Sequence, residues 1–217
     1  MRKGLNERKA FKTCRGSEES AKGSGGDKNY LKDLTMNKFF GHLKTITRHK
    51  RLVRRFCFKC GLYRQGICHD LSKYTPTEFL AGVKYFSGVR SPNDDERRDK
   101  GYSAAWLHHK GRNRHHWEYW TDYKGKEGIQ PVEMPAKYVA EMCCDRIAAC
   151  RVYHGKEYRQ TDALEYFSRS KTAPLLMHPN SAALLRKWLR ICAEQGEQAV
   201  FDEIKRTLRE EKNNCGE

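Results

Sequence analysis

The sequence predicts an all-α protein, and three observations support this fold class. Between Met36 and Cys60, apolar side chains recur at the spacing of a helix while cations occupy the opposite face. Capping residues and prolines mark the starts of further helices. Apolar residues then keep a helical period to near the end of the chain. At 217 residues and 25.4 kDa, the chain is long enough to bury one helical core.

Residues 1–35 differ in composition from the rest of the chain. They are rich in Lys, Ser, Gly and Glu, contain few apolar residues and include the run Gly23-Ser24-Gly25-Gly26. Such a segment cannot bury enough apolar surface to order itself. We therefore expect a disordered basic extension over 1–35 and a helical domain over 36–212, with Met36 as an alternative start of translation.

Neither a membrane span nor a signal peptide is expected. No run approaches 18 apolar residues, and the first residues lack the apolar segment of a signal peptide. The nine cysteines are odd in number and fall mostly within apolar helical patterns, which favours reduced thiols over a disulfide framework. We expect a soluble, cytoplasmic protein.

The pair Cys57-x-x-Cys60 has the spacing of a zinc or redox motif. It falls at the end of the first predicted helix, where the helix dipole raises rather than lowers a thiol pKa. We expect cysteines packed in the core. Zinc held by Cys57, Cys60, Cys68 and His69 is the alternative.

The helix predicted over 36–60 places His42 and His49 on its apolar stripe and should end at Gly61. A lone histidine on such a stripe is usually packed in the core, and His49 is the better ligand candidate of the two. We interpret the basic face of this helix as solvated surface rather than a nucleic-acid contact. The net charge of +16 attracts polyanions without selecting among nucleic acid, nucleotides and phosphorylated metabolites.

A short helix predicted over 62–69 ends in an imidazole beside a carboxylate. His69 and Asp70 are costly to hold near a core unless something pairs with them, and a divalent cation is a suitable partner. The stretch Thr75-Pro76-Thr77-Glu78 supplies an N-cap, a proline at the first helical position and a capping-box acid. A helix that starts there leaves Asp70 and Lys73 in a turn, where side chains can converge on a ligand.

Residues 87–101 are expected to form a long loop or lid, since they combine Gly, Ser-Pro-Asn and a run of charges. Tyr85, Arg90 and Asn93 are candidate substrate contacts in this region. A surface loop without a role is the alternative. Ser103 should cap the helix that follows.

Four of the nine histidines fall between Trp106 and Trp117, beside three basic side chains. Histidines with lysine and arginine suit a phosphate on or beside a metal, because imidazole ligates or donates while the cations neutralise oxygen charge. Ordinary packing or surface exposure would explain one or two of these histidines but not the cluster. The candidate residues are His108, His109, Lys110, Arg112, Asn113, His115 and His116.

Pro135 opens a long predicted helix that runs to about residue 153. Asp145 borders its buried stripe, where an unpaired carboxylate would be costly. We expect a metal to satisfy this carboxylate, with Arg146 as the alternative partner. The remaining predicted helices complete the core and begin near Asp162, Ser181 and Gly196.

The order of these residues resembles the HD superfamily of metal-dependent phosphohydrolases. The stretch Ile67-Cys68-His69-Asp70-Leu71-Ser72-Lys73 is similar to its apolar-His-Asp-x-Gly-Lys motif, and residues 142–147 to its small-apolar-Asp-Arg/Lys-apolar helix. More narrowly, residues 61–63, 69–74 and 108–113 resemble a bacterial family recorded only as a domain of unknown function, with the motif GLYxQGxxHDLSKY. The resemblance covers about residues 38–210.

The resemblance implies an HD-domain-like helical bundle around one divalent ion, which would be manganese, iron, cobalt, nickel, zinc or magnesium. Its implied ligands are His49, His69, Asp70 and Asp145. The ion would lower the pKa of a bound water, and Asp70 could also orient that water. Lys73, with Lys110 or Arg112, would hold the phosphate. A second ion or a proton donor would come from His108, His109, His115 and His116.

The function expected from this resemblance is hydrolysis of a phosphoester on a phosphorylated small molecule or nucleotide. The candidate substrate contacts are Lys73, Arg90, Lys110, Arg112, Asn113 and His116. Two alternatives remain open. One is a di-iron oxygenase on the same fold, and the other is a non-enzymatic protein that binds nucleic acid through the basic helix.

Overall fold

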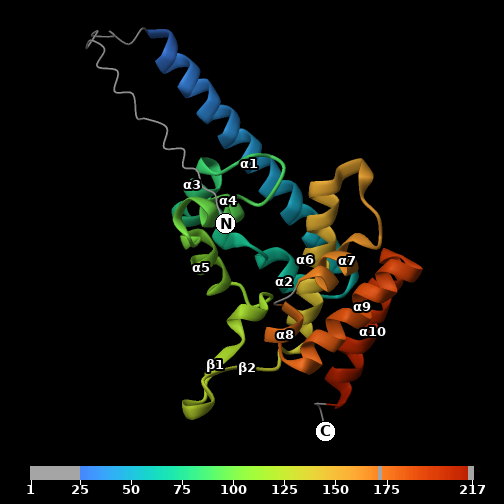
Figure 1. Ribbon diagram of the computed structural model, residues 1–217. Helices are drawn as coiled ribbons and strands as arrows, with labels where there is room; N and C mark the ends of the chain where they lie inside the picture. The colour runs from blue at the N-terminus through green and yellow to red at the C-terminus, as the bar shows by residue number, and fades with distance from the viewer. Residues whose placement is uncertain (1–24, 171–172, 215–217) are drawn as a thin grey trace, which may run out of the picture.

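The computed structural model describes residues 25–170 and 173–214, and helices dominate this part of the chain (Figure 1), as the sequence predicts. The helices are α1 (Gly25–Lys59), α2 (Tyr63–Cys68), α3 (Pro76–Lys84), α4 (Pro92–Lys100), α5 (Ala104–Lys110), α6 (Ala136–His154), α7 (Asp162–Arg169), α8 (Ala173–Leu176), α9 (Pro179–Gln195) and α10 (Glu197–Asn214). Short 3-10 turns are η1 (Leu71–Tyr74), η2 (Trp117–Tyr119), η3 (Gly125–Glu127) and η4 (Gly155–Glu157). A small antiparallel hairpin joins β1 (Thr121–Tyr123) to β2 (Ile129–Pro131).

Helix α6 lies in the centre of the described structure and packs against α1, α7, α9 and α10. Figure 1 shows it between α1 and the α9–α10 pair. Several sides of α6 are buried, and the helices around it supply large apolar side chains that fill the remaining space. The fully buried core residues include Val53, Val139, Ile147, Phe167, Leu185, Trp188, Leu189, Val200, Phe201 and Ile204. No helix of the described residues is both long and apolar enough to cross a bilayer.

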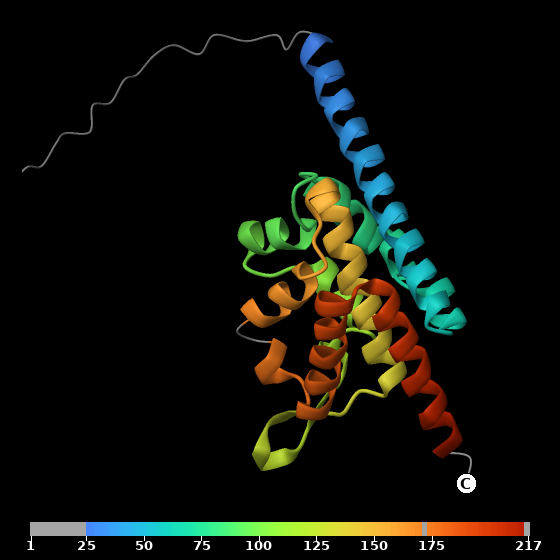
Figure 2. The ribbon, with the colours of Figure 1, turned by 90° about the vertical axis from the view of Figure 1, so that its right-hand side faces the viewer.

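Helix α1 begins at Gly25, so the expectation of disorder is wrong for residues 25–35. The N-terminal part of α1 projects beyond the rest of the described chain (Figure 2), and the side chains of residues 33–37 are exposed. Backbone hydrogen bonds of a helix are local, so a helix nucleated by packed residues can continue into a polar segment without tertiary contacts. The disorder expected for residues 1–24 lies outside the described residues.

The end of α1 and the start of α2 follow the sequence prediction. Gly61 adopts a positive φ of 79°, and the Leu62 N–H donates to the Cys57 carbonyl at 2.8 Å, which closes the helix. Cys57 and Cys60 are buried in the core, and the Cys60 Sγ lies 3.8 Å from the Cys144 Sγ. The alternative zinc site is not assembled, because Cys68 is exposed and no metal-compatible group in the described part of the chain contains a cysteine.

The loop expected over 87–101 is wrong in its second half, which forms α4. Its charges suit a helix, because acids occupy the first turn, cations occupy the last turn, and Gly101 closes the end with a φ of 80°. Helix α4 positions the start of α5. Its buried Glu96 accepts hydrogen bonds from the Ser103 hydroxyl at 2.7 Å and from the Ala105 N–H at 3.3 Å, which fixes the start of α5.

Candidate metal centre

The chain between α2 and η1 places two adjacent side chains in the interior. Asp70 adopts the left-handed conformation, with φ 54° and ψ 26°, and no other non-glycine residue of the described chain has a positive φ. This conformation costs free energy and often marks a functional position. It turns the backbone directly after His69, so that both side chains face the same buried region.

A first group of side chains comprises His49 of α1, His69, Asp70, and Asp145 of α6. Their candidate ligand atoms all lie within 4.8 Å of one another. The Asp145 Oδ1 is 2.9 Å from the His49 Nε2 and 3.4 Å from the His69 Nε2. The Asp70 Oδ2 is 3.3 Å from the His69 Nε2 and 3.8 Å from the His49 Nε2. The fold therefore brings together the four residues that the sequence predicts as metal ligands.

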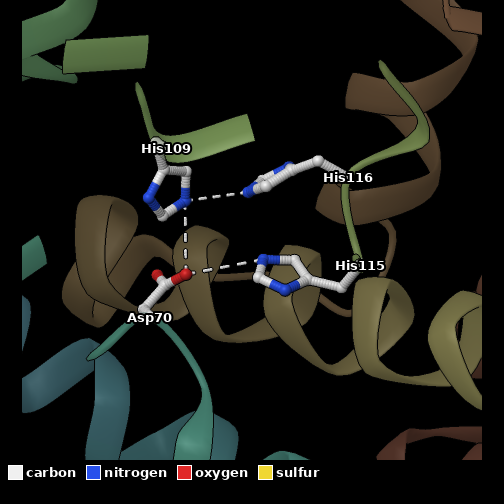
Figure 3. Close-up of side chains that lie close together, drawn as sticks. All are labelled: Asp70, His109, His115 and His116. Carbon is white, nitrogen blue, oxygen red and sulfur yellow. Dashed lines mark hydrogen bonds and ion pairs between the residues drawn. The ribbon is translucent and has the colours of Figure 1, made fainter. Parts of the chain in front are cut away.

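A second group lies on the other side of the same aspartate and comprises Asp70, His109, His115 and His116. The Asp70 Oδ1 is 3.2 Å from the His109 Nε2 and 3.5 Å from the His115 Nε2, and the Nε2 atoms of His109 and His116 lie 2.9 Å apart (Figure 3). The two oxygens of Asp70 thus face different groups. This carboxylate has the position of a bridge between two cation sites.

Glu141 of α6 determines which nitrogen of two of these imidazoles faces inward. Its Oε1 accepts the Nδ1–H of His69 at 2.9 Å and the Nδ1–H of His115 at 3.1 Å. With the proton held on Nδ1, the Nε2 lone pair of each ring is directed at the groups around Asp70. These three residues are also close enough to hold an ion among themselves, but their hydrogen bonds already occupy the atoms concerned.

Glu78 of α3 has the same role at the second group. Its Oε2 accepts from the His109 Nδ1 at 2.7 Å, and its Oε1 accepts from the His108 Nδ1 at 2.7 Å. Asn113 supports this arrangement, because its Nδ2 donates to the Ser72 Oγ at 2.8 Å and to the His109 carbonyl at 2.8 Å. Such outer partners orient ligands and raise their basicity.

Five buried polar atoms of the centre make no hydrogen bond of regular geometry within the described structure, although the Lys73 Nζ forms an ion pair with the Asp70 Oδ2. They are the Nε2 atoms of His49, His69 and His115 and both carboxylate oxygens of Asp70. Buried atoms of this kind rarely lack a hydrogen bond, and these five converge from three segments of the chain. Imidazole nitrogens and carboxylate oxygens are ligands for divalent first-row metals. The residues present therefore fit a divalent cation.

The charge states of the centre also suit cation binding. Burial would raise the pKa of Asp70, but His69 and Lys73 outweigh it and hold this pKa well below its usual range. The pKa of Asp145 is lowered for a similar reason, because the imidazoles that face it outweigh its burial. Burial and the neighbouring imidazoles lower the pKa of His116 well below its usual value. The carboxylates are ionised and His116 is neutral, as ligation requires. The neighbouring carboxylates outweigh burial and raise the pKa of His69 and of His109, so a cation that binds these two rings would displace a proton.

One edge of the centre reaches solvent. The side chains of His69 and Asp70 are 0% and 3% exposed, whereas those of Asp145 and Lys73 are 17% and 30% exposed. The Lys73 Nζ lies 2.6 Å from the Asp70 Oδ2. An anionic ligand can therefore approach at an edge where an ammonium group already stands.

Several predicted site residues lie apart from the two groups. His108 is on the far side of Glu78 and is not among the residues spaced for an ion, so the structure does not support it as a ligand. Arg90 pairs with Asp95 at 2.5 Å in the connection before α4, and Arg112 donates to the His108 carbonyl at 3.3 Å. In the described part of the chain, neither Arg90 nor Lys110 contacts the two groups through an ion pair or hydrogen bond. Asn113 donates a hydrogen bond to the His109 carbonyl and so helps to orient His109.

Packing accounts for two further residues that the sequence left open, His42 as a ligand candidate and Arg146 as a partner of Asp145. His42 is a core histidine, because its ring packs against Phe79 and Phe86, and burial lowers its pKa to about 4. Arg146 lies over the Phe167 ring at 5.4 Å, whereas Asp145 faces the imidazoles of the first group.

Neither glutamate was predicted from the sequence as part of the centre. The position of Glu78 three residues after Thr75 predicts a capping-box acid, but its carboxylate accepts from the histidines of α5, and Thr75 donates to the Ser72 carbonyl without capping α3. Glu141 precedes Asp145 by one helical turn and therefore lies on the same face of α6. That spacing is the signal that could have identified it.

Comparison with known proteins adds one finding. The model of the family described as "Family of unknown function (DUF5662)" matches residues 38–191, a segment that contains every residue of both groups and both glutamates. No curated protein and no solved structure matches the chain.

Proposed function

This chain belongs to the family of unknown function DUF5662, and we propose that it is a metal-dependent phosphohydrolase of the HD type that acts on a phosphoester of a small molecule or nucleotide. One observation carries the proposal. The Asp70 carboxylate lies between two groups of buried histidines, and its two oxygens face different groups. A bridging carboxylate with histidine ligands on both sides is typical of hydrolytic centres with two ions.

The two groups would hold up to two ions. His49, His69, Asp70 and Asp145 would bind the first, and Asp70 would share the second with His109, His115 and His116. Three imidazoles in the second group favour manganese, iron, cobalt, nickel or zinc there, because magnesium prefers oxygen ligands. A bound divalent ion supplies a nucleophile near neutral pH by lowering the pKa of water, and it polarises a phosphoryl oxygen.

Lys73 is the substrate-facing cation of this proposal. Its Nζ contacts Asp70 at the exposed edge, and the charge of Asp70 raises its pKa despite burial, so the group is an ammonium at all physiological pH values. It can neutralise charge on the phosphoryl oxygens as the P–O bond breaks. If the second group holds no ion, His109 would be the candidate proton donor to the leaving oxygen, because Asp70 and Glu78 raise its pKa despite its burial.

A di-iron oxygenase is the second candidate, and the same three imidazoles of the second group support it. Metal analysis and optical spectroscopy separate the two functions. Tightly bound iron with an absorption band of an oxo-bridged pair would favour the oxygenase. Hydrolysis supported by manganese, cobalt or zinc without such a band would favour the hydrolase.

The test is hydrolysis of a panel of nucleotides and simple phosphomonoesters and phosphodiesters by the purified chain, with each divalent ion in turn. We expect activity with at least one ion and its loss in His69→Ala and Asp145→Ala. Lys59→Ala is the matched control, because Lys59 is exposed and contacts Gln198 instead of the metal centre. Activity that survives in Asp70→Ala, or a metal-loaded chain that hydrolyses nothing in the panel, would refute the proposal.

A further inference from the structure

A groove with a volume of 1020 Å³ lies between α2, the α5–η2 connection, α6 and α10. Its size is at the upper end of pockets for small ligands, which span roughly 300–1,000 Å³. Glu141 and His115 line its inner end, whereas none of His49, Asp70 and Asp145 does. Glu141 accepts hydrogen bonds from the Nδ1 atoms of His69 and His115, whereas their Nε2 atoms face the candidate cation sites. The groove therefore reaches the metal centre on the Nδ1 side of these two imidazoles.

Cations line one side of this groove. Arg64 comes from α2, Arg112 and Arg114 come from the α5–η2 connection, and Lys137 comes from the first turn of α6. All four side chains are exposed. They converge from segments that are far apart in sequence, so the concentration of charge is a product of the fold.

Helix α10 lines the opposite side with a cationic stripe. Lys205, Arg209 and Lys212 are spaced by four and three residues and so lie on one face of the helix. Glu211 and Glu141 are the acids of the groove lining, and Glu141 is already engaged by two imidazoles. Cations therefore greatly outnumber available acids in the groove.

The groove cations are not neutralised by neighbouring acids. Within the described residues, none of them lies within ion-pair distance of a carboxylate, a property that they share with Arg51 and Arg55 on the basic face of α1 but not with Arg97 of α4. Unpaired like charges repel one another, and a surface of this kind attracts polyanions and focuses them into the concave region. The arrangement suits a ligand with several phosphates along an extended chain.

Aromatic rings stand among these cations. Tyr63 is 60% exposed at the groove, and the Tyr138 ring lies under Lys137 at 5.3 Å and within 6.0 Å of the Arg114 guanidinium. Single-stranded nucleic acids bind to surfaces that combine a cationic path for the backbone with aromatic rings on which bases stack. A duplex would not offer free base faces to these rings.

We propose that this groove binds single-stranded nucleic acid, with phosphates on the cations of α2, the α5–η2 connection, α6 and α10 and with a base stacked on Tyr63. The groove does not include His49, Asp70 or Asp145, so this binding site is separate from the candidate metal centre. The proposed binding is a further activity in addition to the proposed hydrolysis. Binding should therefore persist in Asp70→Ala, so the failure of either proposal can be distinguished from the failure of the other.

The test is fluorescence anisotropy with the full chain and a fluorescein-labelled oligothymidine of about twelve nucleotides, within the usual range of site sizes. If all seven cations contact phosphates, affinity should fall about 1,000-fold between 50 and 200 mM salt. Arg209→Glu/Lys212→Glu should weaken binding by at least about tenfold and flatten the salt dependence. Tyr63→Ala should weaken it by about five- to a hundred-fold through lost stacking.

Two double variants serve as controls with the same change of net charge. Lys156→Glu/Arg190→Glu changes exposed cations outside the groove and should bind like the native chain. Arg51→Glu/Arg55→Glu changes the basic face of α1 and should also retain most of the affinity. Circular dichroism confirms the helical fold of every variant.

Three outcomes would overturn the proposal. The first is the absence of salt-dependent binding. The second is a loss of affinity in Arg51→Glu/Arg55→Glu that equals or exceeds the loss in the groove variant, which would move the site to α1. The third is equal affinity for inorganic polyphosphate of similar length with no effect of Tyr63→Ala, which would show a site for polyanions in general.

Discussion

Replacing Glu141 by alanine should weaken both cation sites at once. The Glu141 Oε1 accepts from the His69 Nδ1 in the first group and from the His115 Nδ1 in the second. Loss of an outer partner of a ligand usually lowers metal affinity ten- to a hundred-fold, or about 1.4 to 2.7 kcal/mol. Because one change frees a ligand in each group, we expect about a hundred-fold weaker binding of both ions in Glu141→Ala.

Two further variants separate the effect of the Glu141 charge from that of its hydrogen bonds, and the first cation site from the second. Glu141→Gln keeps an acceptor oxygen without the charge, and we expect the smaller, about tenfold loss for both ions. Glu78→Ala frees the Nδ1 of His109, which belongs only to the second group, so it should weaken one ion and leave the other unchanged. Glu194→Ala is the control, since this glutamate is exposed on α9.

The assay is competition for zinc or manganese with a chromophoric chelator, followed by elemental analysis of the dialysed protein. A thermal melt of each variant checks that the fold is retained. The reasoning would be refuted if Glu141→Ala bound both ions as tightly as the native chain. It would also be refuted if Glu78→Ala and Glu141→Ala gave the same pattern of loss.

Three further predictions concern substrate, pH and packing. Lys73→Met should retain the metal and lower kcat by about a hundred- to a thousand-fold, measured with the hydrolysed substrate and elemental analysis. Burial lowers the pKa of His42 from 6.5 to about 4, so its neutral form stabilises the fold above pH 6.5 and this contribution is lost as pH falls towards 4. Urea unfolding at pH 7 and pH 5 should show about 2 kcal/mol more loss in the native chain than in His42→Leu. Gly82→Ala places a Cβ against the His42 ring and should cost about 1–3 kcal/mol in urea unfolding, with partial recovery in the double variant with His42→Ala.

The sequence was most informative where local patterns decide the structure. The helix over residues 36–59, the start of α3 at Pro76 and the end of α1 at Gly61 follow from periodicity, proline position and glycine conformation. The placement of Asp145 also followed from its phase on α6, because an acid beside a buried stripe requires a partner. These inferences need no knowledge of long-range contacts.

Features that depend on contacts between distant segments were not accessible in this way. Glu78 follows Thr75 by three residues, as a capping acid does, and only the position of α5 shows that it accepts from histidines. Helix α4 is an exception, because its charges resemble a loop in composition, while their order, with acids in the first turn and cations in the last, is a local signal for a helix. The groove cations are likewise scattered along the chain, and only the packing of α10 beside α2 and α6 concentrates them.

The most direct test of the central claim is the number of divalent ions per chain, measured by elemental analysis after loading and dialysis. We expect two ions in the native protein, one in His109→Ala, and neither retained in Asp70→Ala, because the Asp70 carboxylate faces both groups. Unchanged metal content in His69→Ala/Asp70→Ala would contradict the assignment of the metal centre.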